Sequence, residues 1–181
     1  MEVECILHRL IYRRHRVHHC KLWMKLYAAG VPFDILIMFA YWFMRLFCVV
    51  DWNNNRSDVF AMKSGVRQGS VISCWLFNVY VNDLINFLEI SGNGCMLEGK
   101  YVGCIMYADD ILLLSASRIK LQKMLDICSA YAVEYSLIFN GKKSWCMIYG
   151  KNWDYNDMSK MIIAGTGISW VYEGVYLGIK L

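Results

Sequence analysis

The sequence predicts an α+β fold in which helices pack on one face of a small antiparallel sheet. Two observations support this. Apolar residues recur at helical spacing in the segments 19–29, 33–47, 73–88 and 121–132, and short apolar runs joined by turn residues lie between and after them. At 181 residues and 57% hydrophobic content, the chain can form one domain with a large core. We therefore expect a single domain over residues 1–181.

The first two predicted helices have local start and stop signals. Gly30-Val31-Pro32 ends the first helix before the second begins at Phe33. Residues 35–44 of the second helix are all apolar, but a bilayer span needs about twenty such residues. This favours a buried core helix over a membrane segment. Further along, Asn53-Asn54-Asn55 between two short apolar runs predicts a hairpin.

The excess positive charge lies near the N-terminus. Residues 1–30 hold six Lys and Arg against two Glu, whereas the rest of the chain balances 13 against 13. The same region contains all four histidines, His8, His15, His18 and His19. A basic stripe of this kind can bind along the phosphate backbone of a nucleic acid, but it can also be a solvated helix face. The charge alone favours the solvated face.

The eight cysteines are spread along the chain, with no two closer than nine residues, so no zinc-binding spacing is present. Several lie in apolar segments, where Cys behaves as a small core residue. The start Met1-Glu2-Val3-Glu4 lacks the order of a signal peptide. We expect an intracellular protein, cytoplasmic or nuclear.

The most informative motif is Tyr107-Ala108-Asp109-Asp110, which lies between two apolar runs. Such runs joined at Ala-Asp-Asp predict a hairpin whose turn carries the acids. Two adjacent carboxylates in apolar surroundings are costly unless a cation lies against them. Magnesium at this turn would suit phosphoryl transfer.

Further motifs surround the acidic turn. Upstream are Gly65-Val66-Arg67-Gln68-Gly69-Ser70 and, within the helix predicted from Ser73 onward, Leu76-Phe77-Asn78-Val79-Tyr80. Downstream are Asn140-Gly141-Lys142-Lys143-Ser144 and Tyr176-Leu177-Gly178-Ile179. In this order and spacing, the set resembles the reverse transcriptase domain of non-LTR (LINE-like) retrotransposons. The resemblance runs from about Arg16 to the C-terminus.

This resemblance implies a polymerase palm fold and RNA-directed DNA polymerase activity by two-metal nucleotidyl transfer. The implied partners are an RNA template, a DNA primer, deoxynucleoside triphosphates and Mg²⁺, with no membrane. The implied catalytic residues are Asp109, Asp110 and Lys143, of which Asp109 and Asp110 bind metal. The implied substrate contacts are Gly65, Arg67, Gln68, Gly69 and Tyr107, and the implied primer contacts are Tyr176, Leu177 and Gly178.

The resemblance breaks at one catalytic position. The family's motif places Asp after Phe or Tyr and before Arg-Val-Asn-His, and the aligned run here is Arg14-His15-Arg16-Val17-His18-His19. His15 thus occupies the position of a metal-binding Asp, and imidazole is a poor ligand for Mg²⁺. Residues 1–15 also show none of the apolar strand that leads into this Asp, so we expect an atypical N-terminal segment. The family's fingers motifs would precede residue 1, which implies a truncated, partly degenerate copy with the fingers largely missing.

Three hypotheses follow. The first is a reverse transcriptase domain that is inactive in this chain alone, because His15 replaces a catalytic Asp. The second is a non-catalytic remnant that binds nucleic acid. The third is a membrane or interaction protein built around residues 35–44, a segment that instead matches an apolar helix of the family.

Overall fold

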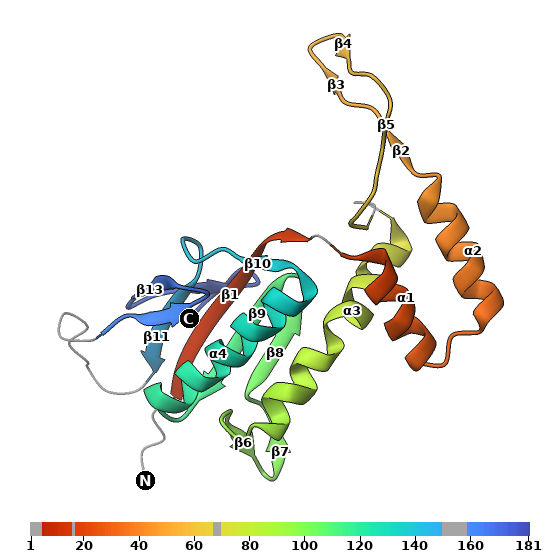
Figure 1. Cartoon of the computed structure of the whole chain (residues 1–181). Helices are drawn as coiled ribbons and strands as arrows, with labels where there is room; N and C mark the ends of the chain where they lie inside the picture. Colours follow the sequence, from red (N-terminus) through yellow and green to blue (C-terminus); the bar gives the residue numbers. More distant parts are fainter. Residues whose placement is uncertain (1–4, 16, 67–69, 150–158) are drawn as a thin grey trace. The chain divides into compact units, whose positions relative to one another are not determined.

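The structure is a computed structural model that describes residues 5–15, 17–66, 70–149 and 159–181, with the backbone alone for residues 5–15 (Figure 1). The sequence indicates one domain, whereas the structure groups into two compact units. The larger unit comprises Met1–His15 with Val81–Leu181, and the smaller comprises Arg16–Tyr80. Each unit is described by itself.

A seven-stranded sheet forms the centre of the larger unit, in the order β12-β13-β11-β1-β9-β8, with β10 also paired to β1. The pairs are antiparallel except for β11 with β13. This confirms the predicted mixture of helices and antiparallel sheet. The strands are β1 Cys5–His15, β8 Cys104–Tyr107, β9 Asp110–Ser115, β10 Leu137–Phe139, β11 Trp145–Tyr149, β12 Met161–Ile163 and β13 Thr166–Trp170.

Strand β1 lies in the interior of this sheet. It pairs with β9 on one side and with β11 and β10 on the other. The expectation that residues 1–15 lack a strand is therefore wrong for Cys5–His15. The physical reason is that β structure depends strongly on the neighbouring strands, and a run containing Arg13-Arg14 carries little strand signal by itself.

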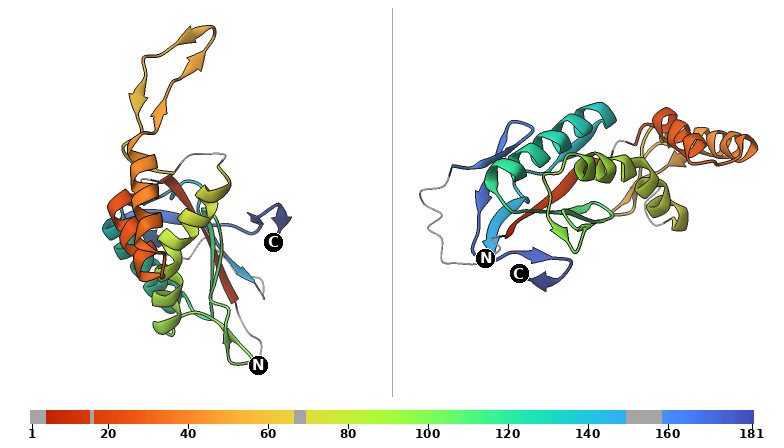
Figure 2. Two further views of the ribbon diagram at one scale, coloured as in Figure 1. Left: turned by 90° about the vertical axis from the view of Figure 1, so that its right-hand side faces the viewer. Right: turned by 90° about the horizontal axis from the view of Figure 1, so that it is seen from below.

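Helix α4, Arg118–Tyr135, covers one face of the sheet and contacts β9, β10 and β12. Figure 2 shows α4 on one side of the strands and a small hairpin, β14 Val175–Tyr176 with β15 Ile179–Lys180, on the other. The predicted helical period is confirmed, since the buried residues of this helix are Leu121, Met124, Leu125, Cys128, Tyr131 and Ala132.

Helix α3, Val71–Ile90, has an apolar stripe, as predicted: Leu76, Tyr80, Leu84 and Leu88 are fully buried. Within the larger unit, Phe87 on α3 packs edge-on against Tyr131 of α4, with ring centroids 6.2 Å apart. Among the described residues, α3 is also the one helix whose length and apolar composition would allow it to cross a membrane. A buried core helix meets the same criterion.

In the smaller unit, α1 is His19–Ala28 and α2 is Phe33–Met44. A ribbon follows, in which β2 Phe47–Cys48 pairs with β5 Phe60–Ala61, and β3 Asp51–Trp52 pairs with β4 Asn55–Arg56. The turn between β3 and β4 is Asn53-Asn54, both with positive φ, as a two-residue hairpin turn requires. The predicted hairpin is therefore present, in two short paired segments.

The prediction of a buried core helix holds for one face of α2. Leu36, Phe39 and Phe43 are buried, but the opposite residues Ile37, Met38, Tyr41, Trp42 and Met44 are exposed. A hollow of about 400 Å³ opens between α1 and α2, lined by Trp23, Met24, Tyr27, Phe33, Leu36, Ile37 and Ala40. The sequence pattern is apolar on all sides and does not distinguish these two faces.

One cap of α4 uses an unfavourable residue. Ser117 caps the N-terminus by accepting a hydrogen bond from the Lys120 N–H at 3.2 Å, whereas Ser136 ends the helix in the left-handed conformation, with φ 54°. Glycine is preferred there, because a Cβ raises the energy of this conformation by about 1 kcal/mol.

We expect Ser136→Gly to stabilise the chain by about 1 kcal/mol, because the strain at this cap is relieved. Thermal unfolding should show a melting temperature about 2–4 °C higher. Ala130→Gly is the matched control, at an exposed position inside the same helix, where glycine costs about 1 kcal/mol. Equal shifts for the two variants would contradict the assignment of strain to Ser136.

Candidate active site on the acidic hairpin

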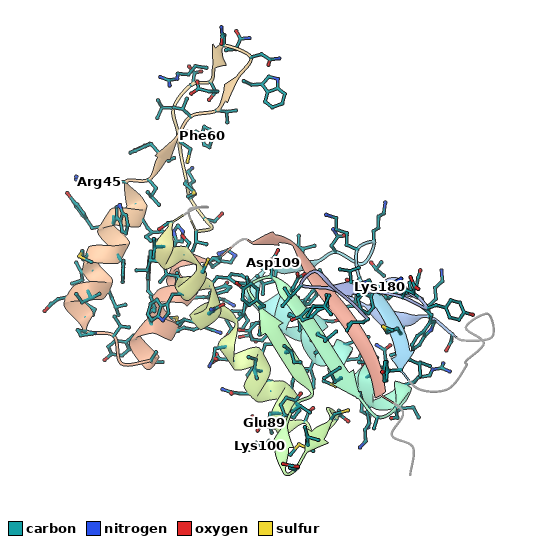
Figure 3. The ribbon with its side chains drawn as sticks, turned by 180° about the vertical axis from the view of Figure 1, so that it is seen from behind. Arg45, Phe60, Glu89, Lys100, Asp109 and Lys180 are labelled. Atoms are coloured by element: carbon teal, nitrogen blue, oxygen red, sulfur yellow. The ribbon has the colours of Figure 1, made fainter. Side chains whose placement is uncertain are left out.

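The acidic motif forms the tip of the hairpin between β8 and β9, as predicted. The strands pair from Cys104 with Leu113 to Tyr107 with Asp110, which leaves Ala108-Asp109 as a two-residue turn. Figure 3 shows Asp109 at this tip, where the two strands end. Asp110 is the first residue of β9.

The turn is held in a costly backbone conformation. Ala108 has φ 51°, a left-handed value that costs a residue with a Cβ about 1 kcal/mol. The paired strands β8 and β9 impose this conformation on the turn. Strand β9 is fixed in place because its residues Ile111 and Leu113 are fully buried. Strain of this kind is common where a structure holds functional side chains in place.

The two carboxylates of the tip are partly buried, and Tyr107 beside them is 67% exposed. Two adjacent acids with reduced access to water favour a cation, and carboxylate oxygens are the ligands that Mg²⁺ prefers. Cys104 lies at the other end of β8, opposite Leu113, and burial raises the pKa of its thiol to about 12.

The strand register gives Asp110 a partner other than His15. In β1, the partner of Asp110 is Ile11, and the pairing of β1 with β9 ends there. His15 pairs instead with Leu137 of β10. His15 is therefore not the register partner of Asp110, and a register shift in β1 lies between Tyr12 and Arg14.

The donor set for a metal is incomplete in the part of the chain that the structure describes. No group of three or more His, Cys, Asp or Glu side chains there could hold a metal ion. Strand β1 cannot supply the missing carboxylate in any register, because Cys5–His15 contains neither Asp nor Glu. Asp109 and Asp110 therefore fit a divalent cation only in part.

Lys143 lies in a tight turn that precedes β11. The Asn140 carbonyl accepts hydrogen bonds from the N–H groups of Lys143 and Ser144, each at 3.0 Å, and from the Ser144 hydroxyl at 2.9 Å. Ser144 is buried by this arrangement, while Lys142 and Lys143 are exposed. The turn borders a hollow of about 400 Å³, lined by residues 141–145 and by Thr166, Gly167, Ser169 and Val171.

The predicted primer contacts lie on the small hairpin of β14 and β15. Leu177 and Gly178 form its turn with φ 49° and 81°, an unusual conformation for Leu. Tyr176 is buried, and its hydroxyl donates to the Ile105 carbonyl of β8 at 3.2 Å. The structure thus brings this hairpin against a strand of the acidic hairpin.

The predicted glycine-rich loop belongs to the smaller unit, and Arg67, Gln68 and Gly69 lie outside the described residues. Gly65 is described and has φ 91°, which favours glycine. The N–H of Gly65 donates to the Val17 carbonyl at 3.0 Å, and its own carbonyl is 2.8 Å from Nε2 of His19. The site residues predicted from the sequence do not include His19. The family motif Arg-Val-Asn-His, whose last residue aligns with His19, was the available signal.

Comparisons with known proteins agree with this arrangement. The sequence profile of the family described as "Reverse transcriptase (RNA-dependent DNA polymerase)" matches residues 15–181. The RNA-directed DNA polymerase from mobile element jockey of Drosophila funebris is 29% identical over 172 residues, which cover 92% of this chain and 18% of that protein. The chain thus spans about a fifth of the length of this relative.

A solved structure shares the fold. Apo telomerase from Candida tropicalis, truncated from its C-terminal domain, superposes with a TM-score of 0.65 at 14% identity, over 98% of this chain and 34% of the telomerase chain. At this identity the likeness shows the fold alone, a palm-like α+β arrangement. Together with the motifs and the acidic hairpin, these matches show that the chain belongs to the reverse transcriptase family, as a domain of the non-LTR retrotransposon type.

Proposed function

We propose that this reverse transcriptase domain carries an incomplete metal site and does not catalyse RNA-templated DNA synthesis by itself. The observation that carries the proposal is that β1, the strand paired with the acidic strand β9, contains no carboxylate. Enzymes of this family use divalent metal ions. When bound, such ions would activate the primer hydroxyl and hold the triphosphate.

Two carboxylates on one hairpin cannot perform the whole of this task. A two-metal site would need carboxylate ligands beyond Asp109 and Asp110, and a facing strand could supply one. Asp109 and Asp110 retain negative charge at the tip, so they keep affinity for a cation without completing the pair. Primer extension with Asp109→Ala as background tests the proposed loss of catalysis.

We further propose that the domain retains the binding of an RNA template paired with a DNA primer. Exposed Lys142 and Lys143 support this, because they lie beside a hollow that Ser169 and Thr166 also line. Two cations next to hydroxyl groups suit phosphate oxygens. Tyr176 supports the primer side of the proposal through its bond to Ile105 of β8, and Leu177 and Gly178 form the turn beside it.

The salt dependence of primer–template binding tests this second proposal. We expect Lys142→Gln/Lys143→Gln to weaken binding about tenfold and to reduce the slope of log affinity against log salt by about 1.5, because each lost phosphate contact removes 0.7–0.9 of slope. Fluorescence anisotropy with a labelled RNA–DNA duplex measures both quantities.

The matched control is Lys100→Gln/Lys120→Gln, which removes the same charge from two other exposed lysines. It should leave the slope nearly unchanged. A control that weakens binding as much as the Lys142 and Lys143 variant would show that net charge alone is responsible. If the unaltered chain binds no duplex even at low salt, the binding function is excluded.

The proposal also places the chain inside the cell, in the cytoplasm or nucleus, without a membrane partner. The seven cysteines in the described residues with side chains are free of disulfides. Three of them, Cys104, Cys128 and Cys146, have their pKa raised by burial, so they behave as neutral core groups. This use of cysteine is typical of a reducing compartment.

A further inference from the structure

We propose that His19 is a positioning residue, which fixes the start of the loop Gly65–Ser70 by holding the carbonyl of Gly65. The proposal deepens the proposed function, since it rests on the loop contacting template or nucleotide. All the contacts that carry it lie within the smaller unit, Arg16–Tyr80.

The first observation is that one short segment binds both backbone polar groups of Gly65. The Gly65 N–H donates to Val17, and the Gly65 carbonyl accepts from Nε2 of His19 at 2.8 Å. Because a carbonyl can only accept, Nε2 carries the proton in this arrangement. Val17 is fully buried, which makes the segment a fixed support.

The second observation is that aromatic contacts hold the His19 ring. Its centroid lies 5.0 Å from that of Phe43, nearly edge-on, and 6.0 Å from that of Trp23. Trp23 and Phe43 also pack on each other, with centroids 5.2 Å apart. A ring confined on two sides loses little further freedom when it forms a hydrogen bond, so the bond to Gly65 is pre-organised.

The third observation concerns the helix that follows the loop. The His18 N–H donates to the hydroxyl of Tyr80 on α3 at 3.3 Å, and the Lys25 ammonium donates to the Tyr80 carbonyl. Tyr80 is fully buried. Burial raises the pKa of its phenol above the usual value, so the hydroxyl stays neutral and accepts the bond. The segment Val17–His19 thus contacts both Gly65 and the helix after the loop.

These contacts have a consequence for ligand binding. Because both backbone polar groups of Gly65 are bonded, this residue has fewer conformations to lose when it contacts a template or nucleotide. Glycine adopts the positive φ of Gly65 freely, and the bond from His19 holds the carbonyl of that residue. Loss of the His19 donor should therefore loosen Gly65 without removing the aromatic packing.

Two substitutions separate the donor from the ring. His19→Phe keeps an aromatic ring between Trp23 and Phe43 but has no donor, whereas His19→Gln restores an N–H at similar reach. Hydrogen exchange of the Gly65 amide reports how often its bond to the Val17 carbonyl opens, and this opening should be more frequent when the Gly65 carbonyl is no longer held. We expect about fivefold faster exchange in His19→Phe, an unchanged melting temperature, severalfold weaker primer–template binding, and recovery of both properties in His19→Gln.

His18→Phe is the matched control, because it replaces an exposed histidine next to His19 and retains the His18 N–H that bonds to Tyr80. Unchanged Gly65 exchange in His19→Phe would overturn the proposal, as would faster exchange with unchanged duplex binding. Failure of His19→Gln to restore exchange would also overturn it. If the unaltered chain binds no duplex, the proposed function fails, while the exchange measurement still decides whether His19 holds Gly65.

Discussion

Primer extension by this chain alone is expected to equal that of its Asp109→Ala variant, on an RNA template with either Mg²⁺ or Mn²⁺. The physical reason is the missing carboxylate of β1, which leaves Asp109 and Asp110 without a ligand from the facing strand. Loss of transition-state stabilisation of about 4 kcal/mol corresponds to a rate about a thousandfold lower than that of a complete site. The extension of a labelled primer, followed over time on a denaturing gel, measures the rate for the chain and for Asp109→Ala.

Robust extension that disappears in Asp109→Ala would contradict this prediction directly. Two further variants then locate the missing ligand. Ile11→Asp places a carboxylate at the register partner of Asp110, whereas His15→Asp places it where the motif comparison expects it. We expect Ile11→Asp to tighten Mn²⁺ binding about tenfold, because ligand charge count controls affinity, and His15→Asp to change it less. Titration calorimetry measures the Mn²⁺ affinity of each variant.

Removal of residues 1–15 is expected to abolish folding of the larger unit. Strand β1 pairs with β9, β10 and β11, so its loss leaves the facing edges of these strands unpaired. A domain is stable by only about 5–15 kcal/mol, which the loss of an interior strand exceeds. Circular dichroism and thermal unfolding should show no cooperative transition.

Removal of residues 1–4 is the control for this deletion, because it leaves Cys5–His15 intact. We expect it to retain a cooperative transition. A deletion of residues 1–15 that unfolds cooperatively at the temperature of the full chain would contradict the interior position of β1. It would then support the view that the sequence before Arg16 is dispensable.

The local part of this fold could be predicted from the sequence. Helix α4 follows from its apolar period, and α1 ends where Gly30 and Pro32 predict. The acidic hairpin follows from two apolar runs around Ala108-Asp109. Each of these features depends on residues close together in the chain, so spacing alone is informative.

Strand β1 shows where prediction from spacing fails. Its sequence alternates irregularly and contains Arg13-Arg14, yet it pairs on both sides in the sheet. The partners lie about a hundred residues or more downstream, and no local pattern encodes their register. For the same reason the motif comparison could assign His15 to the position of a metal-binding Asp, but it could not predict that Ile11 is the register partner of Asp110.

His19 shows the same limit at the level of one side chain. The sequence presents it as one of four N-terminal histidines in a basic stripe. Its bond to Gly65, 46 residues away, exists because α1 brings the ring against Phe43 and the loop. A long-range contact of this kind has no signature in composition or charge.

By itself, the sequence determined the family, the order of the motifs, the helices and the acidic turn, because these depend on residue types and short spacings. Only the tertiary structure decided that the atypical N-terminus is an interior strand, that Ile11 is the partner of Asp110, and that His19 binds Gly65. These facts depend on pairings between distant segments. Burial and hydrogen bonding select such pairings only when the whole chain has folded.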